Sequence, residues 1–175
     1  MRNSLVVIAL LVFSSCSFLE KKGFNYKTYT HPSVQFKIDY PRSWEMQEGG
    51  RMGGQVVFLS NKKEVFQANV NLVLSPADIP DMDVLSRLSI QQLKLILNQY
   101  ELITQHRTKL GNLDAFELRG RYSAKEGNRI IRTVVAVDNG NEFVLTFTAA
   151  ADQEKNYTQI INHMIQSFHY DSKSR

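Results

Sequence analysis

The chain has 175 residues and a formal net charge of +4, and it is 43% hydrophobic and 22% charged. These values are typical of a soluble globular protein that is large enough to build one self-sufficient core. Its lysines and arginines are dispersed, without the basic patch or motif typical of nucleic-acid-binding proteins, so nucleic acid is not an expected partner. The single cysteine, Cys16, excludes an intrachain disulfide.

The N-terminus has the features of an export signal. A short positive start, Met1 to Asn3, precedes the uncharged apolar segment Leu5 to Phe13. This segment has the length of a signal-peptide hydrophobic region and is too short to cross the hydrocarbon of a bilayer as a helix. We therefore predict that residues 1–15 are a signal peptide.

The end of this segment, Phe13-Ser14-Ser15-Cys16, resembles a bacterial lipobox, in which a large apolar residue and two small ones precede the lipid-accepting cysteine. We predict cleavage before Cys16 and attachment to a membrane by lipid on that residue. If the cell has two membranes, Ser17 favours the outer one. An ordinary secretory signal with a coincidental cysteine is the alternative.

The mature chain is expected to contain a tether at 16–22, one domain at 23–170 and a frayed tail at 171–175. No strand or helix is predicted for His169 and Tyr170, which are interpreted as the start of the tail. Alternation or apolar content predicts strands throughout the domain. In chain order they are Val34–Tyr40, Gln55–Ser60, Ala68–Leu74, Leu102–His106, Phe116–Tyr122, Arg129–Val137 and Glu142–Ala150, with a hairpin turn at 138–141.

Two amphipathic helices are predicted. The first is capped by Asp83 and carries an apolar stripe from Leu85 to Tyr100; the second is capped by Asp152 and runs to Phe168. The last two strands before the second helix carry apolar residues on both faces, so both faces need cover. We therefore predict an α+β fold, an α/β/α sandwich with a central antiparallel sheet and helices on both faces.

Several short segments resemble PsbP-like proteins, the extrinsic photosystem II subunits and their bacterial relatives. The resemblance rests on Gly23 to Tyr26, on Val34 to Trp44, on Asn69 to Leu72, on Ala115 to Leu118 and on Ile165 to Phe168. The same fold resembles that of the DcrB envelope lipoproteins and of Mog-type proteins. The resemblance implies the fold and an accessory role in a larger complex, because the matching residues are turns and core positions.

No catalytic motif is present, and we expect neither an enzyme nor a bound cofactor. The glycine-rich run at 49–54 leads into a strand rather than a helix, so it is interpreted as a loop and not a phosphate site. Asp78, Asp81 and Asp83 lack the spacing of a calcium loop. The four histidines, at positions 31, 106, 163 and 169, share no ligand spacing, so no metal site is predicted.

Four arginines are the candidates for a contact surface. If residues 123–128 form a hairpin loop, Arg119 lies opposite Arg132, with Arg121 on the same face and Arg129 nearby. Like charges directly opposite each other are destabilising unless a counter-charge is near. Glu117 is one candidate for that counter-charge, and an anionic partner is the other.

The sequence leads to two functional hypotheses. The first is a non-catalytic lipoprotein of the cell envelope that binds or supports another envelope protein. The alternative is a carrier of a small ligand or lipid. An exposed flat apolar patch favours the protein binder, whereas an apolar pocket with convergent polar groups favours the carrier.

Overall fold

The computed structural model describes residues 24–49, 56–61, 66–79 and 81–172. The predicted signal peptide, Cys16 and the tether lie outside the described residues, as do residues 50–54 of the glycine-rich run. Neither helix of the described part is long and apolar enough to cross a membrane.

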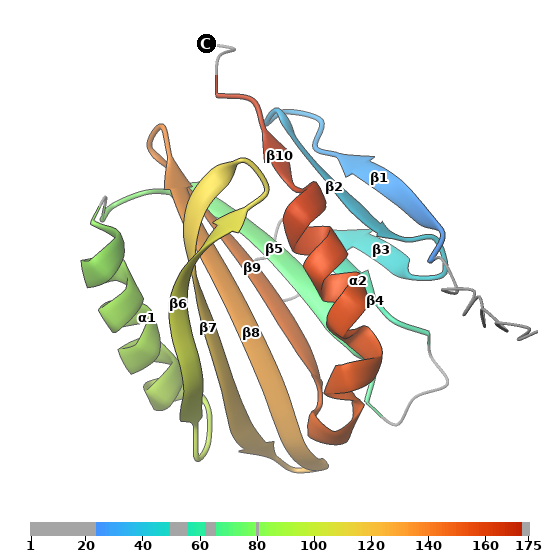
Figure 1. Ribbon diagram of the computed structural model, residues 1–175, viewed down its shortest axis with the longest axis vertical. Coiled ribbons are helices and arrows are strands. Elements are labelled where there is room, and N and C mark those ends of the chain that lie inside the picture. The colour runs from blue at the N-terminus through green and yellow to red at the C-terminus, as the bar shows by residue number, and fades with distance from the viewer. Residues whose placement is uncertain (1–23, 50–55, 62–65, 80, 173–175) are drawn as a thin grey trace, which may run out of the picture.

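Seven strands form one antiparallel sheet in the order β3-β4-β5-β9-β8-β7-β6 (Figure 1). Their bounds are β3 (Glu45–Glu48), β4 (Val56–Leu59), β5 (Asn69–Pro76), β6 (Glu101–Leu110), β7 (Leu113–Ala124), β8 (Gly127–Asp138) and β9 (Asn141–Ala150). The strands from β6 to β9 follow one another as hairpins. The hairpin turn predicted at 138–141 is confirmed, because Asn139 and Gly140 both have positive φ angles, 46° and 74°.

The two predicted helices are α1 (Met82–Ile96) and α2 (Glu154–Ser167). Asp81, not Asp83, caps α1, since its carboxylate accepts backbone hydrogen bonds from Asp83 at 2.9 Å and Val84 at 3.0 Å. These bonds lower the pKa of Asp81. Asp152 lies in a short 3-10 turn before α2 and does not cap it, so this prediction was also wrong.

A second sheet was not predicted. It consists of β1 (Tyr26–Thr30), β2 (Phe36–Pro41) and β10 (His169–Tyr170), in the order β1-β2-β10. The assignment of His169 and Tyr170 to a tail was therefore wrong. This small sheet shares one hydrophobic cluster with α2 and the large sheet.

Aromatic rings join the small sheet to the rest of the domain. The ring of Phe36 in β2 stacks on that of Phe168 at a centroid distance of 5.7 Å, and the Phe168 ring meets that of Phe143 in β9 at 5.3 Å. The turn between β6 and β7 approaches the same region. Gly111 there has a φ of +56°, and a Cβ at this position would lie 1.5 Å from the carbonyl oxygen of Phe168. Only glycine fits at position 111.

Alternate residues of the large sheet belong to two separate hydrophobic clusters. In β8, Val134 and Ala136 pack in the cluster that contains α2, and Val135 packs in the cluster that contains Leu85 of α1. The predicted α+β class is confirmed. The finer prediction of an α/β/α sandwich is not confirmed, because α2 shares its side with a second sheet and the outward residues of β5 and β9 on the other side are only half-buried.

The first testable prediction concerns the core. Phe147 in β9 is 1% exposed and its ring lies 5.9 Å from that of Tyr157 in α2. We expect Phe147→Ala to lower the free energy of unfolding by about 3–5 kcal/mol, because it removes a buried ring and leaves a cavity. Urea unfolding measures this loss, and a change below about 1 kcal/mol would contradict the placement of Phe147.

Candidate functional site

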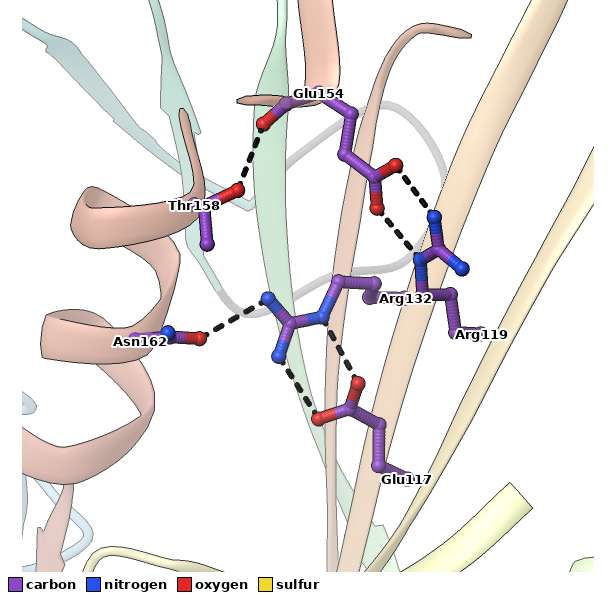
Figure 2. A network of polar contacts seen from close by, with 6 residues as sticks. All are labelled: Glu117, Arg119, Arg132, Glu154, Thr158 and Asn162. Carbon is purple, nitrogen blue, oxygen red and sulfur yellow. Dashed lines mark hydrogen bonds and ion pairs between the residues drawn. The ribbon is translucent and has the colours of Figure 1, made fainter. Parts of the chain in front are cut away.

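Two arginines face each other on neighbouring strands. Arg119 of β7 pairs in register with Arg132 of β8, which confirms the register predicted from the sequence. Figure 2 shows Arg132 between Glu117 of β7 and Asn162 of α2. Its Nε and Nη2 atoms donate to the two Glu117 carboxylate oxygens at 2.9 Å each, and its Nη1 donates to Asn162 at 3.1 Å. Glu117 is buried and Arg132 is largely shielded from solvent, with side-chain exposures of 7% and 14%.

Arg119 has a carboxylate partner of its own. Its Nε and Nη2 atoms donate to the two oxygens of Glu154 at 2.6 Å each, as Figure 2 also shows. Hydrogen bonding to Glu154 raises the pKa of the Arg119 guanidinium. Because Glu154 is the first residue of α2, this pair ties the start of the helix to the sheet. Carboxylates within the chain thus supply the counter-charge that the arginine register requires.

The remaining two arginines lie in different surroundings. Arg121 pairs with Glu101 in an exposed ion pair, and its Nε donates at 2.7 Å. Arg129 is 4% exposed, lies 4.1 Å above the ring of Phe66, and donates to neighbouring backbone carbonyls. The four arginines therefore do not gather on one exposed surface, and their contact with an anionic partner stays a prediction.

Four of the other polar candidates have local partners. Asp81 caps α1, Asp83 pairs with Arg107 of β6, and His31 accepts two backbone hydrogen bonds in the turn after β1. His163 of α2 contacts Asp39 of β2 at 3.3 Å. Among the described residues, no three histidine, cysteine or acidic side chains are grouped as a metal site would need.

A groove of about 370 Å³ lies between the C-terminal half of α1 and strands β5, β8 and β9. The N-terminal half of α1 is firmly attached to the sheet. There Leu85 is buried, and buried Ser86 accepts a hydrogen bond from Gln105 of β6 at 2.7 Å. Further along the helix, Leu93 is only half-buried and Ile96 is 66% exposed, and both line the groove.

The floor of the groove follows from strand register. Val144, Thr146 and Thr148 are the alternate residues of β9 that do not join the α2 cluster. Val144 pairs with Val73 of β5 and Val135 of β8, so three valines form a row across the floor. The next row is polar, because Thr146 pairs with Asn71 of β5 and Thr133 of β8. In the following row Thr148 pairs with the apolar Ile131 of β8, and Tyr122 of β7 also lines the groove.

Unpartnered buried polar atoms gather around this side of the sheet. Those found among the described residues are the Thr133 hydroxyl, the Tyr100 hydroxyl and the Nε of Arg129. Thr133 lines the groove, and the Tyr100 ring stands where a side chain at Gly120 would be, 2.4 Å from such a Cβ. Burial raises the pKa of Tyr100 and that of Tyr122. Buried polar atoms in native proteins usually have hydrogen-bond partners. These three unpartnered atoms therefore make this side of the sheet a candidate ligand site.

None of the groove residues was a candidate from the sequence. A signal existed in β9, where Thr146 and Thr148 alternate with Leu145 and Phe147, so one face of a central strand is polar. A second signal was the predicted stripe of α1, of which Leu88 and Ile96 are exposed in the structure. The groove itself depends on the spacing between α1 and the sheet, and no local pattern encodes that spacing.

Comparison with known proteins identifies the family. The DcrB family matches residues 44–167, which include both helices and all seven strands of the large sheet. The chain belongs to the DcrB family. No curated protein matches it significantly.

Two solved structures share the fold of this DcrB-family chain. The cyanobacterial PsbP protein CyanoP of Synechocystis sp. PCC 6803 aligns with a TM-score of 0.64 at 16% identity, over 91% of this chain and 99% of its own. LpqN of Mycobacterium tuberculosis, described as involved in cell envelope biogenesis, aligns with a TM-score of 0.64 at 19% identity, over 83% and 90%. The PsbP-like, DcrB-type fold suggested by the sequence is thus confirmed.

The buried ion pair generates the second prediction. We expect Glu117→Gln to lower the free energy of unfolding by about 3–5 kcal/mol, because it leaves the buried Arg132 guanidinium without a counter-charge. The matched control is Glu101→Gln, which removes the partner of Arg121 in an exposed pair. We expect that control to cost at most about 1 kcal/mol. Equal urea midpoints for the two variants would show that burial does not distinguish the pairs.

Proposed function

We propose that this chain is a lipid-anchored, non-catalytic accessory protein of the cell envelope, and that its domain binds another envelope protein. Membership of the DcrB family supports an envelope role, as does the likeness to LpqN, which is described as involved in cell envelope biogenesis. The N-terminal sequence supports export and lipid attachment at Cys16. In a cell with two membranes, Ser17 favours the outer membrane as the site of the anchor.

One structural observation carries the protein-binding part. Of the large apolar side chains that are exposed in the described residues, all but Phe24 belong to α1 or to the adjacent strand β6. Leu88 and Leu95 are 42% and 86% exposed, and their spacing of seven residues places them on one side of the helix. Ile103 at a bulge in β6 is 42% exposed.

Two large aliphatic side chains exposed on one side of a helix, with a third on the adjacent strand, favour an interaction surface, because a soluble domain gains nothing by exposing them. Arg87 and Lys94 are exposed beside these leucines and would form the polar rim that surrounds the apolar centre of most protein interfaces. The absence of catalysis is part of the proposal, and it is supported by the lack of any catalytic motif in the sequence.

A carrier role is the second candidate. The groove beside α1 favours it, because the groove is mostly apolar and contains convergent hydroxyl and amide groups. The two roles use different sides of α1. Leu88 and Leu95 do not line the groove, whereas Ser89 and Leu93 do.

The third prediction tests the anchor. We expect Cys16→Ser to prevent lipid attachment, so that the protein accumulates as unprocessed precursor or is released in soluble form. Mass spectrometry of the wild-type protein should find an acylated Cys16 at the mature N-terminus. A mature terminus beyond residue 16 would overturn the lipoprotein proposal.

The fourth prediction tests the partner surface. We expect the double variant Leu88→Gln, Leu95→Gln to lose crosslinks to its envelope partner in intact cells by about tenfold or more, because the apolar centre of the interface is removed. Lys155→Gln at an exposed position of α2 is the control and should keep those crosslinks. Both variants should unfold at nearly the wild-type temperature, since the changed side chains are exposed. Unchanged crosslinking of the double variant would exclude this surface.

A further inference from the structure

We propose that the groove between α1 and strands β5, β8 and β9 binds a single aliphatic chain with an uncharged, hydrogen-bonding head group, such as a monoacylglycerol. This ligand site is additional to the protein-binding surface, and it depends neither on that surface nor on the lipid at Cys16. The shape, lining and charge of the groove each support it.

The groove is long. It includes the outward residues of β9 from Glu142 to Thr148, which span about 20 Å at roughly 3.4 Å per residue. Its lining also crosses the sheet from β5 to Tyr122 of β7. An extended hydrocarbon chain fits along the length of this floor.

The lining favours hydrocarbon over an extended peptide. One end of the floor is the valine row of Val73, Val135 and Val144, and Leu93 and Ile96 of α1 form a wall. The groove lies on a face of the sheet and not at its edge, so it offers few backbone groups to pair with peptide amides. Burying those amides unpaired would be unfavourable, whereas an alkyl chain has none to bury.

The polar part of the lining defines the head group. Thr146, Thr148 and Asn71 present hydroxyl and amide groups along the floor, and Tyr122 closes that end. The unpartnered hydroxyl of Thr133 lies in the same polar row. Hydroxyl and ester groups of a glycerol head can donate to and accept from these side chains.

Charge disfavours an acidic head group. Among the described residues that line the groove, Glu142 is the only charged one, and no lysine or arginine contributes to the lining. Glu142 lies beyond the valine row, at the end opposite to the polar floor, where burial and the nearby Asp78 raise the pKa of its carboxyl. A carboxylate or phosphate head group at the polar end would meet no cation among the residues that line the groove, so a neutral head group is favoured.

The experiment uses the full-length protein in isolated membranes and a monoacylglycerol whose chain carries a photoactivatable diazirine and an alkyne. We expect saturable labelling that unlabelled monoacylglycerol competes away, with crosslinked sites in the groove residues of α1 or β9. The free fatty acid with the same chain should label these sites at least about tenfold less. Mapping by mass spectrometry separates these sites from labelling near the anchor.

Two variants fill the groove, Thr146→Phe on its floor and Ser89→Phe on its helical wall. Each should reduce groove labelling about tenfold or more. Thr104→Phe makes a comparable change at an exposed position of β6 outside the groove and should leave labelling unchanged. The melting temperature and the amount of folded protein are measured for every variant. If Thr146→Phe does not fold, Ser89→Phe alone tests the groove.

Three results would overturn the proposal. The first is the absence of saturable labelling in the groove of the wild-type protein. The second is equal labelling by the fatty acid, which would mean that the head group is not discriminated. The third is recovery of a peptide in place of a lipid when the wild-type protein is analysed by native mass spectrometry. Because Leu88 and Leu95 lie outside the groove, loss of protein crosslinks in their double variant leaves lipid labelling of the groove unaffected.

Discussion

A sheet of seven strands is wider than the helices available to cover it, and this mismatch organises the domain. At about 4.8 Å between strands the sheet is roughly 29 Å wide, whereas one helix with its side chains covers about 10–12 Å. Strands β8 and β9 lie near the centre and carry apolar residues at alternate and sometimes successive positions. On one side, α2 and the small sheet together bury them in one large cluster. On the other side, α1 is the only described helix that covers the sheet, and the outward residues of β5 and β9 form the floor of a groove.

The α2 side also carries two ion pairs, and their arrangement shows how a polar cluster is accommodated under a helix. Glu117 and Arg132 form a bidentate pair, and Arg119 reaches the first residue of α2. A buried pair of this kind contributes little net stability, because desolvation offsets most of the attraction. It does fix geometry, since a shift of α2 along the sheet would separate Glu154 from Arg119 and Asn162 from Arg132. The position of α2 is therefore specified by directional bonds as well as by apolar packing.

Sequence reasoning was most successful where the signal is local. Alternation located β2 and β7, and apolar content located β8 and β9. Turn composition located the hairpin at 138–141, and the register that places Arg119 opposite Arg132 followed from loop length. It failed where structure depends on distant partners. The two residues of β10 become a strand only because β2 lies beside them, and Glu154 became the partner of Arg119 only through the docking of α2. The choice of Asp81 over Asp83 as the cap was ambiguous locally, because both precede the same apolar stripe.

The candidate site was invisible for the same reason, and α1 shows why. Its stripe from Leu85 to Ile96 predicts a helix buried along its whole length, yet Leu85 is the only apolar residue of α1 that is fully buried. Leu93 packs at the margin of the cluster, and Ile96 is 66% exposed. Because Ile96 is exposed, the domain lacks the stabilisation that burial of this side chain would give. At about 25 cal/mol per Å² of apolar surface, that difference is significant for a marginally stable domain. The fold gains nothing from this exposure. The exposed apolar residues of α1 are therefore better explained by the proposed partner and the proposed ligand than by the packing of the domain itself.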